Sequence, residues 1–184
     1  VLYSGHQVRG STVNLIYDAY SKCWILGWTK ETSSHDYGYV RAIKYNEAAD
    51  DIFVNTDTAL MDGNPMHMYK IASNNAGQIV SVYENSGNGN GYAQAKPINP
   101  DGTFSSTGTA VNFQSGNPTE GITLIYEPNC DRFVVFFNQF SASSKRCRVF
   151  RVSGSTISMA DHTSNEFDSN AGSTGENHAD AVYD

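Results

Sequence analysis

The stretch Ile122–Phe137 reads ITLIYEPNCDRFVVFF, which is an apolar run, a short polar turn and a second apolar run rich in aromatic residues. The same pattern occurs 109 residues earlier, where Val13–Trp28 reads VNLIYDAYSKCWILGW. A weaker copy lies between them, because Met68–Tyr83 reads MYKIASNNAGQIVSVY at an offset of 55 residues from the first. A fixed period of this size is typical of solenoids, propellers and tandem arrays. The sequence therefore predicts three repeats of about 55 residues.

Each repeat continues with two more predicted strands. The third strands are expected at Gly38–Ile43, Gly91–Ala95 and Arg146–Val152, and the fourth strands at Ile52–Val54, Phe104–Ser106 and Ile157–Met159. The intervening segments, such as Asn99–Thr103 and Ser153–Thr156, contain the Gly, Pro, Asp and Ser residues that favour tight reversals. One repeat is therefore four short strands joined by polar turns.

The pattern also divides the chain. Repeats are predicted at residues 11–65, 66–119 and 120–177. Residues 1–10 match the end of a preceding repeat, and residues 178–184 match the start of a following one. We therefore expect the sequence to be an excerpt from a longer tandem array.

The second strand of each repeat is apolar on both faces, as in Trp24–Leu26, Ile79–Val80 and Phe133–Phe137. An open sandwich would alternate apolar and polar residues, because one face of each sheet meets water. Helical repeats are excluded, since no segment of useful length shows a 3.6-residue period. The prediction is an all-β fold, a β-propeller or propeller-like stack of four-stranded antiparallel blades. Three blades leave uncovered faces, so closure needs further repeats of the same chain or other copies of it.

Composition limits the possible partners. Only 17% of the residues are charged, and the net charge of −7 disfavours nucleic acid, because phosphate binding requires concentrated Lys and Arg. The basic cluster Lys145–Arg148 is predicted to be a protected strand edge, with an anion site as the alternative. No apolar run approaches 18 residues, so we expect no membrane insertion.

The sequence predicts no enzyme, no metal site and no cofactor. The five His residues are scattered, with no two at ligand spacing on one element. Asp18 and Glu127 could serve glycoside cleavage if they faced each other, but both follow the Tyr that ends a first strand. Because the two acids occupy equivalent positions in repeating units, we expect them to cap the turns that follow rather than to act in catalysis. Among the three Cys residues, a disulfide between Cys130 and Cys147 is the one pairing that stays open.

Aromatic residues near predicted loop ends are the candidate ligand-binding residues. Tyr and Trp rings offer flat apolar faces with a polar handle, which suits stacking on sugar rings. The residues are Trp28, Tyr37, Tyr83 and Tyr92. The alternative is that these rings simply complete strands within the sheets.

The order of these patterns resembles the tandem repeats of large structural and fibre proteins of marine bacteriophages and some marine microbes. Val152–Ser158, Phe167 and Ala181–Asp184 carry the resemblance best, while the middle repeat departs from it with Ala72-Ser73 in place of Tyr-Asp. The resemblance implies an exposed, multi-copy appendage without a cofactor, located extracellularly or on a virion surface.

Two classes of function follow. The first is a structural or adhesive repeat segment of an extracellular appendage or virion fibre, whose partners are other copies or repeats of itself. The alternative is a carbohydrate-binding β-propeller lectin that recognises cell-surface glycans.

Overall fold

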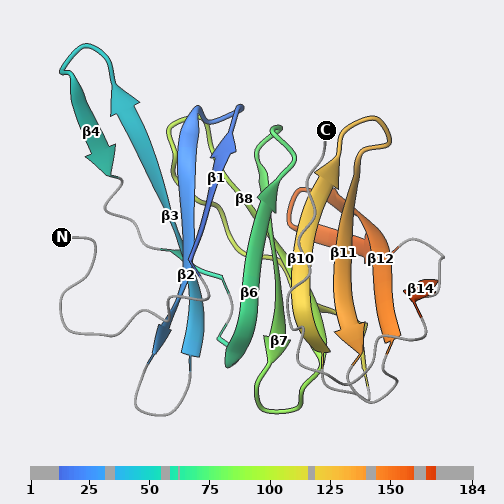
Figure 1. Cartoon of the computed structure of the whole chain (residues 1–184). Helices are drawn as coiled ribbons and strands as arrows, with labels where there is room; N and C mark the ends of the chain where they lie inside the picture. Colours follow the sequence, from blue (N-terminus) through green and yellow to red (C-terminus); the bar gives the residue numbers. More distant parts are fainter. Residues whose placement is uncertain are drawn as a thin grey trace.

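The computed structural model describes residues 13–31, 36–54, 59–61, 63–115, 119–139, 144–159 and 165–168. These residues form strands and turns and contain no helix, which confirms the all-β prediction. The strands make three antiparallel sheets, each built from one contiguous stretch of the chain. Figure 1 shows the sheets standing in a row, with the first in blue, the second in green and the third in yellow and orange.

Within each sheet the main strands are paired in chain order. The first sheet contains β1 (Asn14–Asp18), β2 (Cys23–Glu31), β3 (Asp36–Asn46) and β4 (Asp51–Val54), with β5 (Ala59–Leu60) also paired to β3. The second contains β6 (Met66–Ser73), β7 (Gln78–Asn85), β8 (Gly91–Pro97) and β9 (Val111–Gln114). The third contains β10 (Thr119–Glu127), β11 (Arg132–Gln139), β12 (Ser144–Ser153) and β13 (Thr156–Met159), with β14 (Asn165–Asp168) also paired to β12.

The sequence period is also the structural register. Tyr17 pairs with Trp24 in the first sheet, and Tyr126 pairs with Phe133 in the third. The turn before the second strand ends in a residue of positive φ in all three sheets, namely Lys22, Gly77 and Asp131. The left-handed backbone at this position closes a hairpin each time, with four residues between the last paired positions in the first and third sheets and five in the middle sheet, where Ser73 pairs with Ile79.

The acidic turn caps predicted from the sequence are confirmed. Asp18 Oδ2 accepts a hydrogen bond from the Ser21 backbone N–H at 2.8 Å, and Glu127 Oε1 accepts one from the Asn129 N–H at 2.8 Å. Both carboxylates therefore satisfy turn donors, as Asp and Glu commonly do after a strand.

The middle sheet differs from the prediction at its fourth strand. Phe104 forms an isolated bridge with Ile98, and the strand that pairs with β8 is β9. The turn after Pro97 is closed by the Asn99 N–H, which donates to the Thr103 carbonyl at 2.8 Å. Ser105 N–H still bonds the Pro97 carbonyl at 2.9 Å, so this segment follows the edge of β8 without forming a regular ladder.

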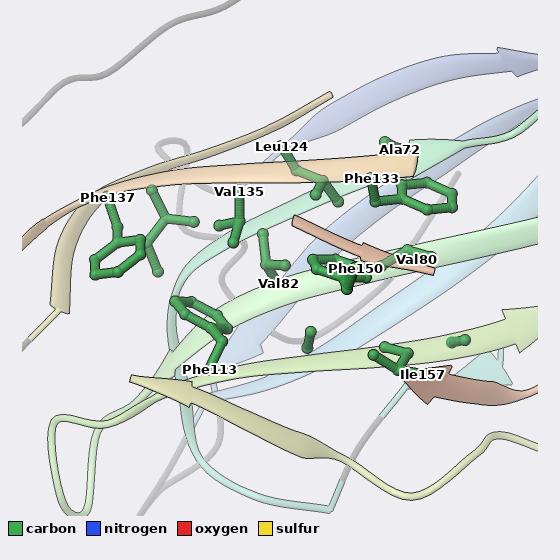
Figure 2. Close-up of a cluster of buried hydrophobic side chains, with 13 residues drawn as sticks. Ala72, Val80, Val82, Phe113, Leu124, Phe133, Val135, Phe137, Phe150 and Ile157 are labelled. Carbon is green, nitrogen blue, oxygen red and sulfur yellow. The ribbon is translucent and has the colours of Figure 1, made fainter. Parts of the chain in front are cut away.

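Two hydrophobic cores separate the three sheets. The first core lies between the first and second sheets and contains Cys23, Ile25, Val40, Ala42, Met61, Met66, Tyr69, Ile71, Ile79, Tyr83 and Ile98. The second, drawn in Figure 2, lies between the second and third sheets and contains Ala72, Val80, Val82, Ala93, Ala95, Phe113, Ile122, Leu124, Phe133, Val135, Phe137, Phe150 and Ile157. Alternate residues of β7 enter different cores, so the middle sheet is covered on both faces.

Tyr69 fills a gap that two glycines leave in the first sheet. A Cβ at Gly38 would lie 2.5 Å from Met66 Sδ and 2.9 Å from Tyr69 Cε2, and a Cβ at Gly27 would lie 3.1 Å from Tyr69 Cε1. The Tyr69 side chain is fully buried, and its hydroxyl donates to the Tyr39 carbonyl at 3.4 Å. Missing side chains in one sheet thus admit a large ring from the next.

We call the side of each sheet that points toward its N-terminal neighbour the front face, and the opposite side the back face. The back face of the first sheet packs on the front face of the second, and the back face of the second packs on the front face of the third. The described sheets form an open row rather than a ring. They establish stacked antiparallel sheets of at least four strands and leave the β-propeller as a prediction.

Candidate functional site on the open face of the first sheet

Strand alternation divides the first sheet into a covered back face and an open front face. Ile25, on the back face, is 0% exposed, whereas the neighbouring Trp24, on the front face, is 48% exposed. The large exposed apolar residues whose pairing register places them on the front face form what we call the front patch. The front patch consists of Leu15, Tyr17, Trp24, Tyr45, Ile52 and Leu60.

A hollow of about 630 Å³ opens at the end of this face, near the β1–β2 and β3–β4 turns. The rings of Tyr17 and Trp24 are among its lining groups, and their centroids lie 5.3 Å apart. The lining residues are Tyr17, Lys22, Trp24, Lys44, Tyr45, Asn46, Glu47 and Ala48. Apolar rings beside ammonium, amide and carboxylate groups make a surface that suits either a protein partner or a polar ligand.

The β3–β4 turn holds one wall of this hollow. The Tyr45 hydroxyl donates a hydrogen bond to Asp50 Oδ1. This bond, with a smaller contribution from desolvation, raises the pKa of Tyr45 above its usual value. The hydrogen bond ties the Tyr45 side chain to the β3–β4 turn.

The four candidate sugar-stacking residues do not form one site. Trp28 and Tyr37 belong to the first sheet, while Tyr83 and Tyr92 belong to the second. Trp28 is 5% exposed and stacks on Tyr39 with centroids 5.8 Å apart, and Tyr83 is 0% exposed and stacks on Tyr92 at 5.8 Å. Burial of the Trp28 and Tyr83 rings favours the alternative that they complete strands, while Tyr37 and Tyr92 remain partly exposed.

Sequence reasoning passed over the exposed aromatics of the front patch. Tyr17 and Trp24 lie inside the repeated hairpin, where the apolar character of both faces predicted burial. The signal that identifies them is positional: they belong to the first repeat, which lacks a preceding sheet among the described residues.

The buried Lys96 side chain, which lies between the first and second sheets, makes hydrogen bonds to other groups of the protein. Lys96 is 6% exposed, and its Nζ donates to Thr107 Oγ1 and, at 3.5 Å, to the Leu60 carbonyl across the first interface. Desolvation lowers the pKa of Lys96 below its usual value. This arrangement links β8 to β5, because Leu60 and Lys96 belong to neighbouring sheets.

No group of three or more His, Cys, Asp or Glu side chains gathers at metal-binding geometry in the described part of the chain. Of the five histidines, only His67 lies in the described ranges. Cys23, Cys130 and Cys147 are free thiols, so the Cys130–Cys147 disulfide is not formed. Burial raises the pKa of the Cys147 thiol, which keeps it protonated and weakly nucleophilic.

No protein-family model, no curated protein and no solved structure matches this chain. Within the described residues, no helix has the length and apolar character needed to cross a membrane.

Proposed function

We propose that this chain is a structural repeat segment that assembles through face-to-face stacking of β-sheets. The observation that carries the proposal is the middle sheet, which is buried on both faces by its neighbours, while the first sheet presents an open apolar front face. A sheet that is apolar on both sides is stable only when both sides are covered. The front face of the first sheet therefore needs a cover, and a further sheet of the same kind would supply it.

The strand order within the sheets and the contacts between their first strands support a β-propeller or propeller-like stack of blades. Each sheet has its main strands paired in chain order, and the first strands of neighbouring sheets contact each other, β1 with β6 and β6 with β10. In a propeller the first strand of each blade lines the axis, so the first strands of successive blades are neighbours. Further blades would come from other repeats or from other copies of the chain.

An assembly of this kind fits an extracellular appendage or a virion fibre, where repeated modules provide length and surface attachment. Electron microscopy of the native material, together with mass determination of the source chain, tests this role. A long chain or polymer with units repeating along an axis is the expected result. Discrete particles without any repeating unit would refute it.

A second candidate is carbohydrate binding, favoured by the hollow at the front face. Tyr17, Trp24 and Tyr45 supply aromatic faces there, and Lys44 and Asn46 supply hydrogen-bond donors. A glycan array with the wild-type chain and the Trp24→Ala variant tests it. A glycan that binds the wild type and is lost in the variant would favour the lectin, whereas equal binding would place any glycan site elsewhere.

A further inference from the structure

We propose that the front face of the first sheet binds the back face of the third sheet of a second copy of this chain, in the register of the internal interfaces. This inference rests on the proposed function and makes it specific, because it names the two surfaces that meet. Each of these two faces has a counterpart at an equivalent place inside the row.

The front face of the first sheet has a buried counterpart in the third sheet. Leu15 pairs with Leu26, and its counterpart Leu124 pairs with Val135. Leu15 is 56% exposed, whereas Leu124 is 7% exposed because it packs against the second sheet. The same type of side chain is thus covered wherever a preceding sheet is present.

Two further counterparts show the same difference. Trp24 is 48% exposed, while Phe133 at the same register is 1% exposed. Ile52, opposite Tyr45 on β4, is 61% exposed, while Ile157, opposite Val152 on β13, is 6% exposed. The front patch therefore has the composition and the strand positions of an interface that the chain already buries once.

The back face of the third sheet completes the comparison. Ile25 and Ala42 form a cross-strand pair on the back face of the first sheet and are buried against the second. Their counterparts Val134 and Val149 form the same pair on the back face of the third sheet and are only partly buried. At this pair the back face of the third sheet is apolar, as is the back face of the first sheet, which covers the front face of the second sheet.

The front face of the first sheet and the back face of the third sheet carry different residues, so a contact between them is head-to-tail rather than two-fold symmetric. A head-to-tail contact makes a ring if its rotation closes and a filament if it does not. Six large apolar side chains exposed on one face of a sheet mark an interaction site rather than ordinary protein surface. The occupant is a second copy because the back face of the third sheet matches the faces that cover front faces inside the row.

Complementation between two interface variants tests the proposal. Leu15→Glu places a charge on the front face of the first sheet and leaves the back face of the third sheet unchanged. Val134→Glu places a charge on the back face of the third sheet and leaves the front face of the first sheet unchanged. Ser86→Glu, in the exposed β7–β8 turn, is the matched control. Circular dichroism establishes that all three variants fold, and sedimentation velocity measures their association.

The wild type and Ser86→Glu should associate as concentration rises, and each interface variant alone should weaken association about tenfold or more, since a charge buried without a partner is costly. An equimolar mixture of Leu15→Glu and Val134→Glu should form a heterodimer that grows no further, through the one pair of intact faces. Failure of the mixture to pair while the wild type associates would overturn the proposal.

Cysteine cross-linking provides a second test of which faces meet. In a Cys130→Ser, Cys147→Ala background, a Trp24→Cys chain mixed with a Val134→Cys chain should give a mixed disulfide, and neither chain should cross-link to itself. A Trp24→Cys homodimer would overturn the front-to-back arrangement. A wild-type chain that stays monomeric, or one whose residues 1–12 cover the front patch, would also overturn it. If the further inference fails but microscopy of the native material shows repeating units, the proposed structural role is still supported.

Discussion

The carboxylate of Asp18 accepts a hydrogen bond from the hydroxyl of Ser73, a residue that lies one repeat period of 55 positions further along the chain. The bond crosses from the first sheet to the second. Ser73 Oγ in turn accepts the Asn75 backbone N–H at 2.8 Å, and Asn75 Oδ1 accepts the Ala19 N–H at 3.1 Å. Equivalent hairpin turns of neighbouring sheets are therefore joined by a polar junction that fixes how one sheet sits on the next.

Removing the Asp18 carboxylate should destabilise the fold. Asp18 is 0% exposed and also accepts hydrogen bonds from the Ser21 N–H and hydroxyl, so Asp18→Ala leaves several donors without their acceptor. We expect a loss of roughly 2–3 kcal/mol in the free energy of unfolding, since each unsatisfied buried donor is costly. Urea denaturation measures it.

Glu127→Ala is the matched control, because Glu127 holds the equivalent turn position in the third sheet but is only partly buried. It caps its own turn through the Asn129 N–H. We expect a loss of no more than about 1 kcal/mol. Equal losses in the two variants would contradict a special role for the junction between sheets.

Gly108 should not accept a side chain. A Cβ at this position would lie 1.7 Å from the backbone oxygen of Ser155, in the turn between β12 and β13. The Gly108 backbone is also held, because its N–H donates to the Ala95 carbonyl and its carbonyl accepts Gln94 Nε2. A side chain at position 108 would therefore force the segment after β8 away from the third sheet.

Gly108→Ala is therefore expected to lower the free energy of unfolding by roughly 2–3 kcal/mol. Hydrogen exchange should show the loss of protection centred on β13. Gly63→Ala, where nothing lies within 4 Å of the added Cβ, should change stability by less than about 0.5 kcal/mol. An equally stable Gly108→Ala chain would show that the two segments do not make this close approach.

Tyr69 should make the fold sensitive to alkaline pH. Burial raises the pKa of Tyr69 well above 10.0, while the unfolded chain ionises near its usual value. The stabilising contribution is complete below about pH 10 and is lost as pH rises toward the folded-state pKa, by up to about 1.4 kcal/mol per pH unit.

Tyr69→Phe should remove this dependence, so the difference in unfolding free energy between wild type and variant should shrink above pH 10. Lys96 has the opposite effect, because its lowered pKa makes the free energy of unfolding rise with pH up to about 10.5. Wild type and Tyr69→Phe share this contribution, so it cancels when the two are compared at the same pH. Tyr45→Phe, at an exposed site, is the control and should leave the alkaline loss in place. A difference between wild type and Tyr69→Phe that stays constant above pH 10 would contradict the buried state of Tyr69.

The register of the first and third repeats is accessible from the sequence because their first hairpins have the same length. Tyr17 with Trp24 and Tyr126 with Phe133 were aligned at one offset, and the structure pairs them across the strands in the same way. The sequence predicts a strand at Phe104 because this residue follows a turn that contains Gly and Asp. The sequence did not show that β9 would occupy the edge of β8 instead.

The candidate site was less accessible for a different reason. Exposure of an apolar side chain in a repeat depends on whether a neighbouring sheet is present, and a repeat pattern treats Trp24 and Phe133 as equivalent. The structure separates them, because Phe133 faces the second sheet while Trp24 faces outward. The sequence instead favours aromatic residues near loop ends, such as Trp28, whose ring stacks on Tyr39 across the strands and is 5% exposed.

The two Trp residues of the chain allow the front face to be measured directly. Trp28→Phe leaves Trp24 as the reporter, and Trp24→Phe leaves Trp28. In dilute solution Trp24 should emit at the longer wavelength and be quenched strongly by acrylamide, because it is 48% exposed, whereas Trp28 should be protected at 5% exposure. As concentration rises, quenching of Trp24 should fall and its emission should shift to shorter wavelength, because the second copy covers it, while Trp28 should not change. Protection of Trp24 that is complete at the lowest concentration would mean that the same chain covers the face, and exposure that persists in the associated state would mean that assembly uses another surface.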